Sequence, residues 1–405
     1  MTNRSNAEND ELTRVAKETL RANDRGGYTV PSPQLYPYQW LWDSGFIALG
    51  WAAFDEERAW RELEVLFSAQ WANGMVPHLI FHRESTGYFP GPDVWRAPGP
   101  IPSSGITQPP VLATVVRRLL ERAGSSLDAE RRARFLYPKL LAFHRWFVRA
   151  RDPERSGLYA IVHPWESGLD NSPIWDTALA RAPRLPVAEL RHDTGHVAAE
   201  QRPRAEEYER YLGLVALFRD LDYEPEAVFE RSPFKVASVS FNAILQRANL
   251  DLLALAEHLA PDDTAEIGGW VERGATALEG LWDEASSFYL SRDLVSGDAI
   301  AVRAFEGFMP LFAGSASAAQ ADSLAATARR WGQQVHYLMP SSDPGAPGFE
   351  PRRYWRGPVW LNVNWMLADG FSRYGHDDLA QRLRSDGIRL ATDAGMWEYF
   401  DPNTG

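Results

Sequence analysis

Apolar positions along this chain recur at helical spacing, three or four residues apart, from one end to the other. In the segment 7–23, for example, Leu12, Val15, Thr19 and Leu20 fall on one face of a helix. The same spacing predicts further helices over 40–54, 56–71, 108–123, 127–151, 205–221, 237–260, 262–284, 304–331, 357–374 and 376–394. No run of alternating apolar and polar residues indicates a strand. The pattern therefore predicts an all-α protein.

The connections between these helices are either short or long. The sequence Gly375-His376-Asp377 indicates a tight reversal between the last two helices. Long connections, rich in Pro, Gly and aromatic residues, cover 72–107, 152–204, 285–303 and 332–356. Long connections in a compact protein usually carry function.

About eleven or twelve amphipathic helices joined in this way predict an (α/α)6 toroid, with the functional site where the long loops gather. We expect a single catalytic domain over 1–405, with loop insertions at about 72–107 and 152–204. An irregular α-solenoid has a similar number of helices, but it would show an internal repeat of roughly 34–47 residues. No strong repeat is present.

Composition limits the possible partners. The formal net charge is -12 and acidic and basic residues are mixed along the chain, which argues against nucleic acid as a partner. Cysteine is absent, which excludes disulfides and thiolate metal sites. No apolar run approaches the roughly 20 residues that span a membrane, and the polar first residues lack a signal-peptide core. We expect a soluble cytoplasmic protein, whose oligomeric state the sequence does not indicate.

Aromatic residues are abundant, with 16 Trp, 14 Tyr and 19 Phe. Many gather with carboxylates, amides and arginines in four segments: YPYQWLWDS (36–44), WESGLDNSP (165–173), YWRGPVW (354–360) and WEYFDPNTG (397–405). Sugars need this mixture, because aromatic faces stack on their C–H surfaces and polar groups bind their hydroxyls. The alternative is that the aromatics pack the inner wall of the helix ring. Four such clusters together favour a sugar-binding cleft.

Other chemistries find little support. His78 and His82, like His192 and His196, have the i, i+4 spacing of a zinc pair. Neither pair encloses the glutamate of an HExxH motif, and a proline or glycine interrupts a regular helix in both. We therefore expect no catalytic metal and no cofactor. Glycine-rich nucleotide loops and a G-x-S-x-G nucleophile turn are also absent.

Five segments resemble a known clan of enzymes: YPYQWLWDSGF (36–46), HPWESGLDNSP (163–173), FNAILQRANLDL (241–252), YWRGPVWLNVNW (354–365) and WEYFDPNTG (397–405). They resemble the (α/α)6 glycoside hydrolases that include trehalase and the processing α-glucosidase I family. The resemblance is closest to the small bacterial mannosylglycerate and glucosylglycerate hydrolases. The segments occur in the family's order and spread over nearly the whole chain.

The resemblance implies inverting hydrolysis of an α-glycosidic bond, with Asp170 as general acid and Glu398 as general base. Inversion requires the two carboxyl groups to lie about 6.5–9.5 Å apart, whereas about 5 Å would favour retention. Burial among Trp165, Trp175 and their neighbours would raise the pKa of Asp170, as an acid requires.

Structural roles are the alternatives for both carboxylates: Asp170 as the cap of a helix that begins near Pro173, and Glu398 as the partner of an arginine such as Arg356. The family usually continues beyond the Thr-Gly of the last segment into a loop and helix that close the ring. We therefore expect either a truncated chain or a different closure, with Glu398 less firmly placed than Asp170.

The resemblance also implies a pocket for the hydrolysed sugar, in which Asp43 binds hydroxyl groups. We expect His78, a structural histidine in the alternative reading, to belong to a lid or wall in or next to the loop 72–107. The expected substrate-binding residues are Tyr36, Trp40, Trp42, Asp43, His78, Tyr88, Gln108, Trp165, Arg204, Tyr354, Trp355 and Arg356.

The expected substrate is small, since helices begin near residue 7 and leave no room for the β-rich domain of the processing glucosidases. A glycerate aglycone would need a cation, for which Arg204 and Arg356 are candidates. Arg204 could equally be a solvated loop residue. Mannosylglycerate is favoured over glucosylglycerate or a trehalase-like substrate. The alternatives of a different class are a sugar epimerase, which would use a facing histidine pair, and a carbohydrate-binding protein without activity.

Overall fold

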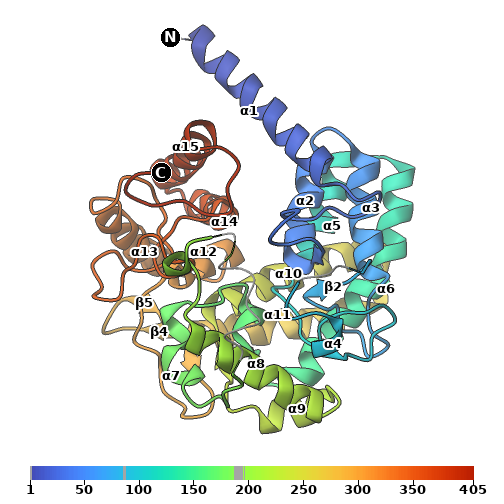
Figure 1. Ribbon diagram of the computed structural model, residues 1–405. Helices are drawn as coiled ribbons and strands as arrows, with labels where there is room; N and C mark the ends of the chain where they lie inside the picture. Colours follow the sequence, from blue (N-terminus) through green and yellow to red (C-terminus); the bar gives the residue numbers. More distant parts are fainter. Residues whose placement is uncertain (1, 85–87, 187–194, 196) are drawn as a thin grey trace.

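The computed structural model describes residues 2–84, 88–186, 195 and 197–405. Within these residues the chain is mainly helical, which confirms the predicted all-α class (Figure 1). The longer helices are α1 (Thr2–Asn23), α2 (Leu41–Ala52), α3 (Glu56–Phe67), α5 (Leu112–Ala123), α6 (Leu127–Ala150), α8 (Ala205–Asp220), α10 (Val239–Leu259), α11 (Thr264–Glu279), α13 (Ala318–Trp331), α14 (Leu361–Arg373) and α15 (Asp377–Asp393). The shorter ones are α4 (Pro92–Trp95), α7 (Asp176–Leu179), α9 (Pro225–Arg231) and α12 (Met309–Ala313).

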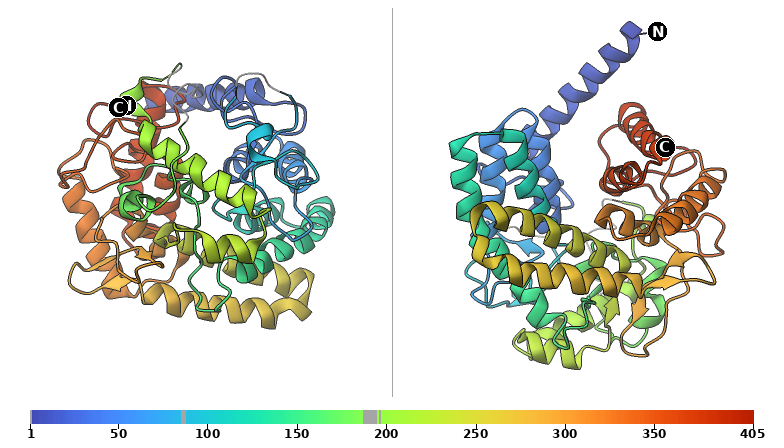
Figure 2. Two further views of the ribbon diagram at one scale, coloured as in Figure 1. Left: turned by 60° about the horizontal axis from the view of Figure 1, so that its bottom comes forward. Right: turned by 180° about the vertical axis from the view of Figure 1, so that it is seen from behind.

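Most of these helices form the predicted (α/α)6 toroid. Helices α2, α5, α10, α12 and α14 pack in turn against one another along its inner side, while α3, α6, α11 and α15 each pack on the outside of the inner helix before them. The two ends of the chain meet where Phe46 of α2 contacts Trp365 of α14, with ring centroids 5.9 Å apart. Helix α1 contacts both α2 and α15 and extends away from the body (Figures 1 and 2).

The inner and outer helices differ in sequence as their positions require. Helix α10 is buried over most of its surface, because α5, α6, α11 and α12 all pack on it. Its first turn is capped by Ser238, whose hydroxyl accepts a hydrogen bond from the backbone N–H of Phe241 at 3.2 Å. The outer helix α15 buries a single stripe and is otherwise exposed. Gly375, with φ of +78°, forms the tight reversal that was predicted between α14 and α15.

One predicted helix, 304–331, is wrong as a single element. The structure divides it into a 3-10 turn at Phe305–Phe308, the short α12, and α13. Gly314 ends α12 with φ of +74°, which a glycine adopts without strain. Ser317 then starts a new helix, because its side chain and that of Gln320 form a capping box. The predicted helix 262–284 is also shorter, since α11 ends at Glu279.

Short strands fix several of the long loops. The structure pairs β1 (Gln39–Trp40) with β2 (Leu79–Ile80), β3 (Val236–Ala237) with β6 (Arg292–Asp293), and β4 (Trp282–Asp283) with β5 (Phe288–Tyr289), all antiparallel. The β1–β2 pair brings the aromatic segment at 36–44 beside the loop 72–107. The elements α4, α7, α8 and α9 lie together at the lower end of the toroid in Figure 1. No helix in the described part of the chain is long and apolar enough to cross a bilayer.

Candidate active site

Glu398 lies where the C-terminal segment runs beside the loop before α14. Val359 and Phe400 exchange two backbone hydrogen bonds, of 2.8 and 3.0 Å, that hold the two segments together. The carboxylate of Glu398 accepts a hydrogen bond from the phenol of Tyr354 at 2.9 Å and from that of Tyr36 at 3.3 Å. Three segments that are far apart in the sequence therefore meet at one carboxylate.

The surroundings of Glu398 act on its pKa in opposite directions. Burial raises the pKa of this carboxyl above its ordinary value, whereas the guanidinium of Arg202 and the phenols of Tyr354 and Tyr36 lower it. Protein surrounds the side chain closely, yet 33% of its surface stays open to solvent. A carboxylate held by donors on one side and open on the other can take a proton from water.

Arg202 is a residue of this site that the sequence did not single out. Its Nη1 donates to the phenol oxygen of Tyr36 at 3.0 Å and lies 4.0 Å from Glu398 Oε2. The guanidinium also lies 4.2 Å from the ring centroid of Tyr354, a cation–π distance. The only signal in the sequence is an Arg-Pro-Arg run in a long loop, which offers two guanidinium groups and does not rank Arg202 above Arg204.

Tyr354 is held in a backbone conformation that residues other than glycine rarely adopt, with φ of +36°. Trp360 Nε1 donates to its carbonyl at 3.2 Å, and the next backbone N–H, of Trp355, donates to Asn171 Oδ1 at 2.9 Å. The indoles of Trp355 and Trp360 stack with centroids 3.7 Å apart. Strain of this kind persists only where the surroundings impose it. Here the imposed conformation places the Tyr354 phenol against Glu398.

Asp170 lies in a loop between two short 3-10 helices, Pro164–Ser167 and Pro173–Trp175. Gly168 ends the first of them with φ of +72°, and a Cβ at this position would lie 2.7 Å from the ring of Trp42. Glycine is therefore required here both by the backbone conformation and by the close approach of the indole. The contact joins the Asp170 loop to the start of α2.

The backbone around Asp170 is fixed separately from its carboxyl group. Tyr211 donates its phenol hydrogen bond to the carbonyl oxygen of Asp170 at 2.8 Å. Ser172 caps the helix Pro173–Trp175, and its hydroxyl accepts from the N–H of Ile174 at 3.4 Å. Ser172 thus fills the capping role that was the structural alternative for Asp170.

Asp43 adds a third carboxyl group, in the first turn of α2. Burial raises the pKa of Asp43 to about 7, and the negative charges of Glu398 and Asp170 add to this effect. Such interactions weaken with distance, so the three carboxyl groups share one region of the site. Near neutral pH Asp43 is partly protonated and can donate a hydrogen bond as well as accept one.

Aromatic rings line the same region. The rings of Tyr36 and Trp40 meet edge to face at 5.4 Å, and Tyr88 meets Trp40 in the same way at 6.0 Å. On another side Trp42 lies 6.3 Å from Trp355. These contacts join the first aromatic segment to Tyr88 and to the third aromatic segment, and such rings are typical of sugar-binding sites.

His78 and Gln108 each contact another residue predicted to bind the substrate. His78 stacks on Trp165 with centroids 6.1 Å apart, and its Nδ1 contacts the hydroxyl of Ser104 at 2.5 Å. Burial lowers the pKa of His78 well below its ordinary value, so the ring is neutral. Gln108 accepts a hydrogen bond from the backbone N–H of Trp42 at 3.2 Å, which fixes the first turn of α2.

The two arginines predicted to bind an anionic aglycone differ in their partners. Arg356 is buried and forms two hydrogen bonds with Asp176, at 2.9 and 2.7 Å, and it lies 3.3 Å from Glu350 and 3.6 Å from Glu207. Arg204 pairs with Glu350 at 2.7 Å and has a side chain that is 49% exposed. Arg356 is therefore committed to carboxylates of the protein, whereas Arg204 is accessible.

The first histidine pair, His78 and His82, does not form a metal site in the described residues. No three His, Asp or Glu side chains in that part of the chain are grouped so that they could hold a metal ion. His78 Nδ1 contacts the hydroxyl of Ser104, whereas His82 Nε2 contacts Gln39 Oε1 at 2.7 Å. His192 and His196 lie outside the described residues.

Comparison with known proteins identifies the family. The model of the mannosylglycerate hydrolase MGH1-like glycoside hydrolase domain matches residues 36–405. The chain belongs to this family of glycoside hydrolases. The match spans all four aromatic segments and both proposed catalytic carboxylates.

Individual relatives support this assignment. The chain is 56% identical to a mannosylglycerate hydrolase of Thermus thermophilus, with 96% of this chain and 95% of the relative aligned. It is 36% identical to a glucosylglycerate hydrolase of Mycolicibacterium hassiacum, over 98% of this chain and 93% of the relative.

Among solved structures, a GH63 mannosylglycerate hydrolase from Thermus thermophilus in complex with Tris and D-glycerate superposes with a TM-score of 0.94. It is 56% identical and aligns over 97% of this chain and 95% of that one. The neutral trehalase of Saccharomyces cerevisiae, 18% identical, matches with a TM-score of 0.62 over 93% of this chain and 70% of that one, which shows a shared fold.

Proposed function

We propose that this glycoside hydrolase cleaves mannosylglycerate to mannose and glycerate, with inversion at the anomeric carbon. The observation that carries the proposal is Glu398, held by the phenols of Tyr36 and Tyr354 and sharing one region with Asp170 and Asp43. The substrate follows from the 56% identity to a mannosylglycerate hydrolase and from the solved relative that binds D-glycerate.

In the proposed reaction Asp170 is the general acid and Glu398 the general base. Asp170 gives its proton to the glycosidic oxygen as the bond to the anomeric carbon breaks, and glycerate leaves as the alcohol. A water on the opposite face attacks the same carbon and gives its proton to Glu398. An α-linked substrate then yields the β-anomer of the sugar.

The residues around Glu398 support its role as base. The phenols of Tyr354 and Tyr36 and the guanidinium of Arg202 all favour the charged carboxylate, so Glu398 is ready to accept a proton despite its burial. The open third of its surface leaves room for the attacking water.

Trp40, Trp42 and Asp43 are proposed to bind the sugar ring. Asp43 shares a region with Glu398 and Asp170, Trp42 directly precedes it, and Trp40 contacts Tyr36, which donates to Glu398. Indole faces suit the C–H surface of a pyranose, and a carboxyl group with a pKa of about 7 suits hydroxyls that both donate and accept.

Arg204 is proposed to bind the carboxylate of the glycerate. Its pair with Glu350 has side chains that are 49% and 32% exposed, and exposed ion pairs contribute little stability. A substrate carboxylate can therefore exchange with Glu350 at small cost. Arg356, buried among three carboxylates, is less suited to this role.

Two other functions are weaker candidates. Glucosylglycerate hydrolysis would use the same residues and is favoured by the 36% identity to an enzyme of that name. A sugar epimerase would need a facing histidine pair. His78 and His163 are close, but His163 accepts from the N–H of Trp165 and donates to the carbonyl of Tyr211, both at 3.0 Å, which occupies both its ring nitrogens.

The proposed function is tested with the purified protein and three substrates: mannosylglycerate, glucosylglycerate and trehalose. The proposal expects mannosylglycerate to be hydrolysed with the highest kcat/KM. Asp170→Asn should lower this value at least about a hundredfold while binding of the substrate survives, because an amide cannot supply the proton. Preference for another of the three substrates would overturn the assignment of the substrate, and full activity of Asp170→Asn would overturn that of the acid.

A further inference from the structure

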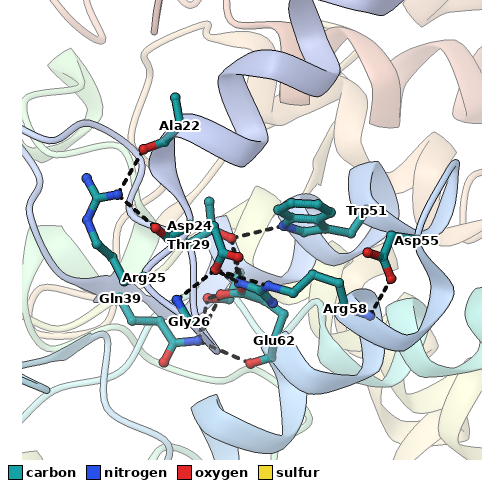
Figure 3. Close-up of polar contacts among 11 residues, drawn as sticks. Ala22, Asp24, Arg25, Gly26, Thr29, Gln39, Trp51, Asp55, Arg58 and Glu62 are labelled. Atoms are coloured by element: carbon teal, nitrogen blue, oxygen red, sulfur yellow. Dashed lines mark hydrogen bonds and ion pairs between the residues drawn. The ribbon is translucent and has the colours of Figure 1, made fainter.

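A buried carboxylate of α3 contacts the first aromatic segment. Glu62 is fully buried, on the same stripe of the helix as Ala59, Leu63 and Leu66. A charged side chain on an apolar stripe is costly unless it is paired and hydrogen-bonded. Figure 3 shows the polar contacts that surround it.

Each of the two carboxylate oxygens of Glu62 accepts two hydrogen bonds. Oε1 accepts from the hydroxyl of Ser44 at 2.8 Å and from Gln39 Nε2 at 2.9 Å. Oε2 accepts from the hydroxyl of Thr29 and from Arg58 Nη2, both at 2.9 Å (Figure 3). Four donors from different parts of the chain thus satisfy this one carboxylate.

Arg58 supplies the opposite charge and extends the network. Its Nη2 also bonds Asp24 Oδ1 at 2.8 Å and Thr29 Oγ1 at 2.9 Å. Trp51 Nε1 donates to the same Thr29 hydroxyl at 2.9 Å, and the guanidinium lies 5.0 Å from the indole (Figure 3). The network therefore ties the segment after α1 to α2 and α3.

Two of the four donors flank the residues proposed to bind the sugar. Gln39 directly precedes Trp40, and Ser44 directly follows Asp43. Glu62 thus holds both ends of the strand-to-helix turn 39–44, which carries these residues and Trp42. This segment joins the two-residue strand β1 to the first turn of α2.

The opposite end of the Gln39 amide reaches the loop 72–107. Its Oε1 contacts His82 Nε2 at 2.7 Å, while its Nε2 also bonds the backbone carbonyl of Glu62 at 3.1 Å. Burial lowers the pKa of His82 to about 4, so this ring is neutral at physiological pH and donates to the amide oxygen. One chain of hydrogen bonds therefore runs from α3 through the aromatic segment to this loop.

We propose that Glu62 is a positioning residue for glycoside hydrolysis: its carboxylate fixes Gln39 and Ser44 and thereby sets the position of Trp40, Trp42 and Asp43 against the sugar. It does not touch the reacting atoms and acts through these neighbours. The proposal rests on the proposed function for the role of the sugar pocket, but not on which sugar is bound.

Glu62→Gln is the change that tests the proposal with the least change of shape. In one amide orientation the new NH2 group faces the guanidinium of Arg58, and in the other it faces the amide NH2 of Gln39. Ser44 and Thr29 can rotate their hydroxyls to accept, but Arg58 and the Gln39 NH2 cannot. One pair of donors is therefore left in conflict, and the turn must shift.

Asp251→Asn serves as the matched control. Asp251 is a buried carboxylate on α10 that also pairs with arginines, Arg247 and Arg117, the latter at 2.6 Å. It has no contact with the aromatic segments among its hydrogen bonds in the described chain. Both variants lose a buried charge, but only Glu62→Gln disturbs the turn 39–44.

The measurements are kcat and KM of folded protein, and the inhibition constants of free mannose and of free glycerate. We expect Glu62→Gln to lower kcat/KM about a hundredfold, since displacement of bound groups by about 1 Å has effects of that size. Mannose should inhibit it more weakly, whereas the inhibition constant of glycerate stays that of the wild type. Asp251→Asn should keep wild-type values of all these quantities, although its melting temperature falls.

Three results would overturn the proposal: unchanged kcat/KM in Glu62→Gln, equal weakening of mannose and glycerate, or equal loss in Asp251→Asn. If Glu62→Gln does not fold, Ser44→Ala removes the link to α2 alone and must reproduce the selective weakening of mannose. The proposed function is tested separately, with the wild-type protein. The variants are then compared on whichever α-glycoside the wild type hydrolyses, with the sugar and the aglycone of that substrate as inhibitors.

Discussion

The contact between Tyr354 and Glu398 gives the sharpest prediction of this structure. Tyr354→Phe removes the phenol that donates to Glu398 at 2.9 Å and lies 3.0 Å from the phenol oxygen of Tyr36. Phenylalanine keeps the ring and has the same backbone preferences, so the residue at φ of +36° is otherwise unchanged. The variant therefore removes one hydrogen bond to the proposed base, together with the contact to Tyr36, and keeps the ring.

The size of the effect follows from that hydrogen bond. A hydrogen bond to a charged group contributes about 1.5–3 kcal/mol. Glu398 is one-third exposed, so water partly replaces the phenol and the lower end, about 1.5 kcal/mol, applies. Losing the donor disfavours the charged form and raises the pKa of Glu398. Because a tenfold change in equilibrium is about 1.4 kcal/mol, the acidic limb of the pH profile of kcat/KM should move up by about one pH unit.

The assay is the dependence of kcat/KM on pH for the wild type, Tyr354→Phe and a control, Tyr374→Phe. Tyr374, just after α14, also donates a phenol hydrogen bond, at 2.8 Å, but to the carbonyl of Ala316. Its variant should keep the wild-type profile. An acidic limb in Tyr354→Phe that stays in place, or that moves to lower pH, would refute the assignment of Glu398 as the base.

Three further changes have expected outcomes. Arg204→Gln should raise KM for mannosylglycerate about tenfold or more and leave inhibition by mannose unchanged, because a charged hydrogen bond to the aglycone is lost; steady-state kinetics measures both. Gly168→Ala should lower the free energy of unfolding by about 1–3 kcal/mol in denaturant titrations and weaken mannose binding, since its Cβ would lie 2.7 Å from Trp42. Asp43→Asn should stabilise the fold more at pH 8 than at pH 4: folding raises the pKa of Asp43 to about 7, so the wild type loses stability as pH rises from about 4 to about 7 and the amide does not. This is checked by the melting temperatures of the variant and the wild type at pH 4 and pH 8. An equal difference between the two proteins at both pH values would contradict it.

The sequence predicted the helical class well, because the spacing of apolar residues and the capping residues determine helices locally. The turn at Gly375 follows from a single residue with a clear conformational role. The break inside 304–331 was missed, since the Ala-rich stretch after Gly314 favours helix. Ser317, followed three residues later by Gln320, was the signal that a second helix begins there.

The site was predicted in outline but not in its contacts. Its aromatic segments were visible because sugar binding requires an unusual local composition. Pairing of Tyr36 with Tyr354, more than three hundred residues apart in sequence, depends on closure of the whole ring and leaves no local signal. Arg202 and Arg204 could not be ranked for the same reason.

Glu62 shows a signal that the sequence did contain. In a helix with several acidic residues it looks like part of a solvated face, yet its spacing from Ala59, Leu63 and Leu66 puts it on the apolar stripe. A carboxylate at such a position predicts a buried polar network. Its partners, however, come from loops whose positions only the fold determines.

The central claim is inverting hydrolysis of an α-linked mannosylglycerate by Asp170 and Glu398. The most direct test follows the reaction by NMR from its first minutes and identifies the anomer of the released sugar before mutarotation. The account predicts β-mannose as the first product. First appearance of α-mannose would contradict it, because retention requires a covalent intermediate and a different role for one of the two carboxylates.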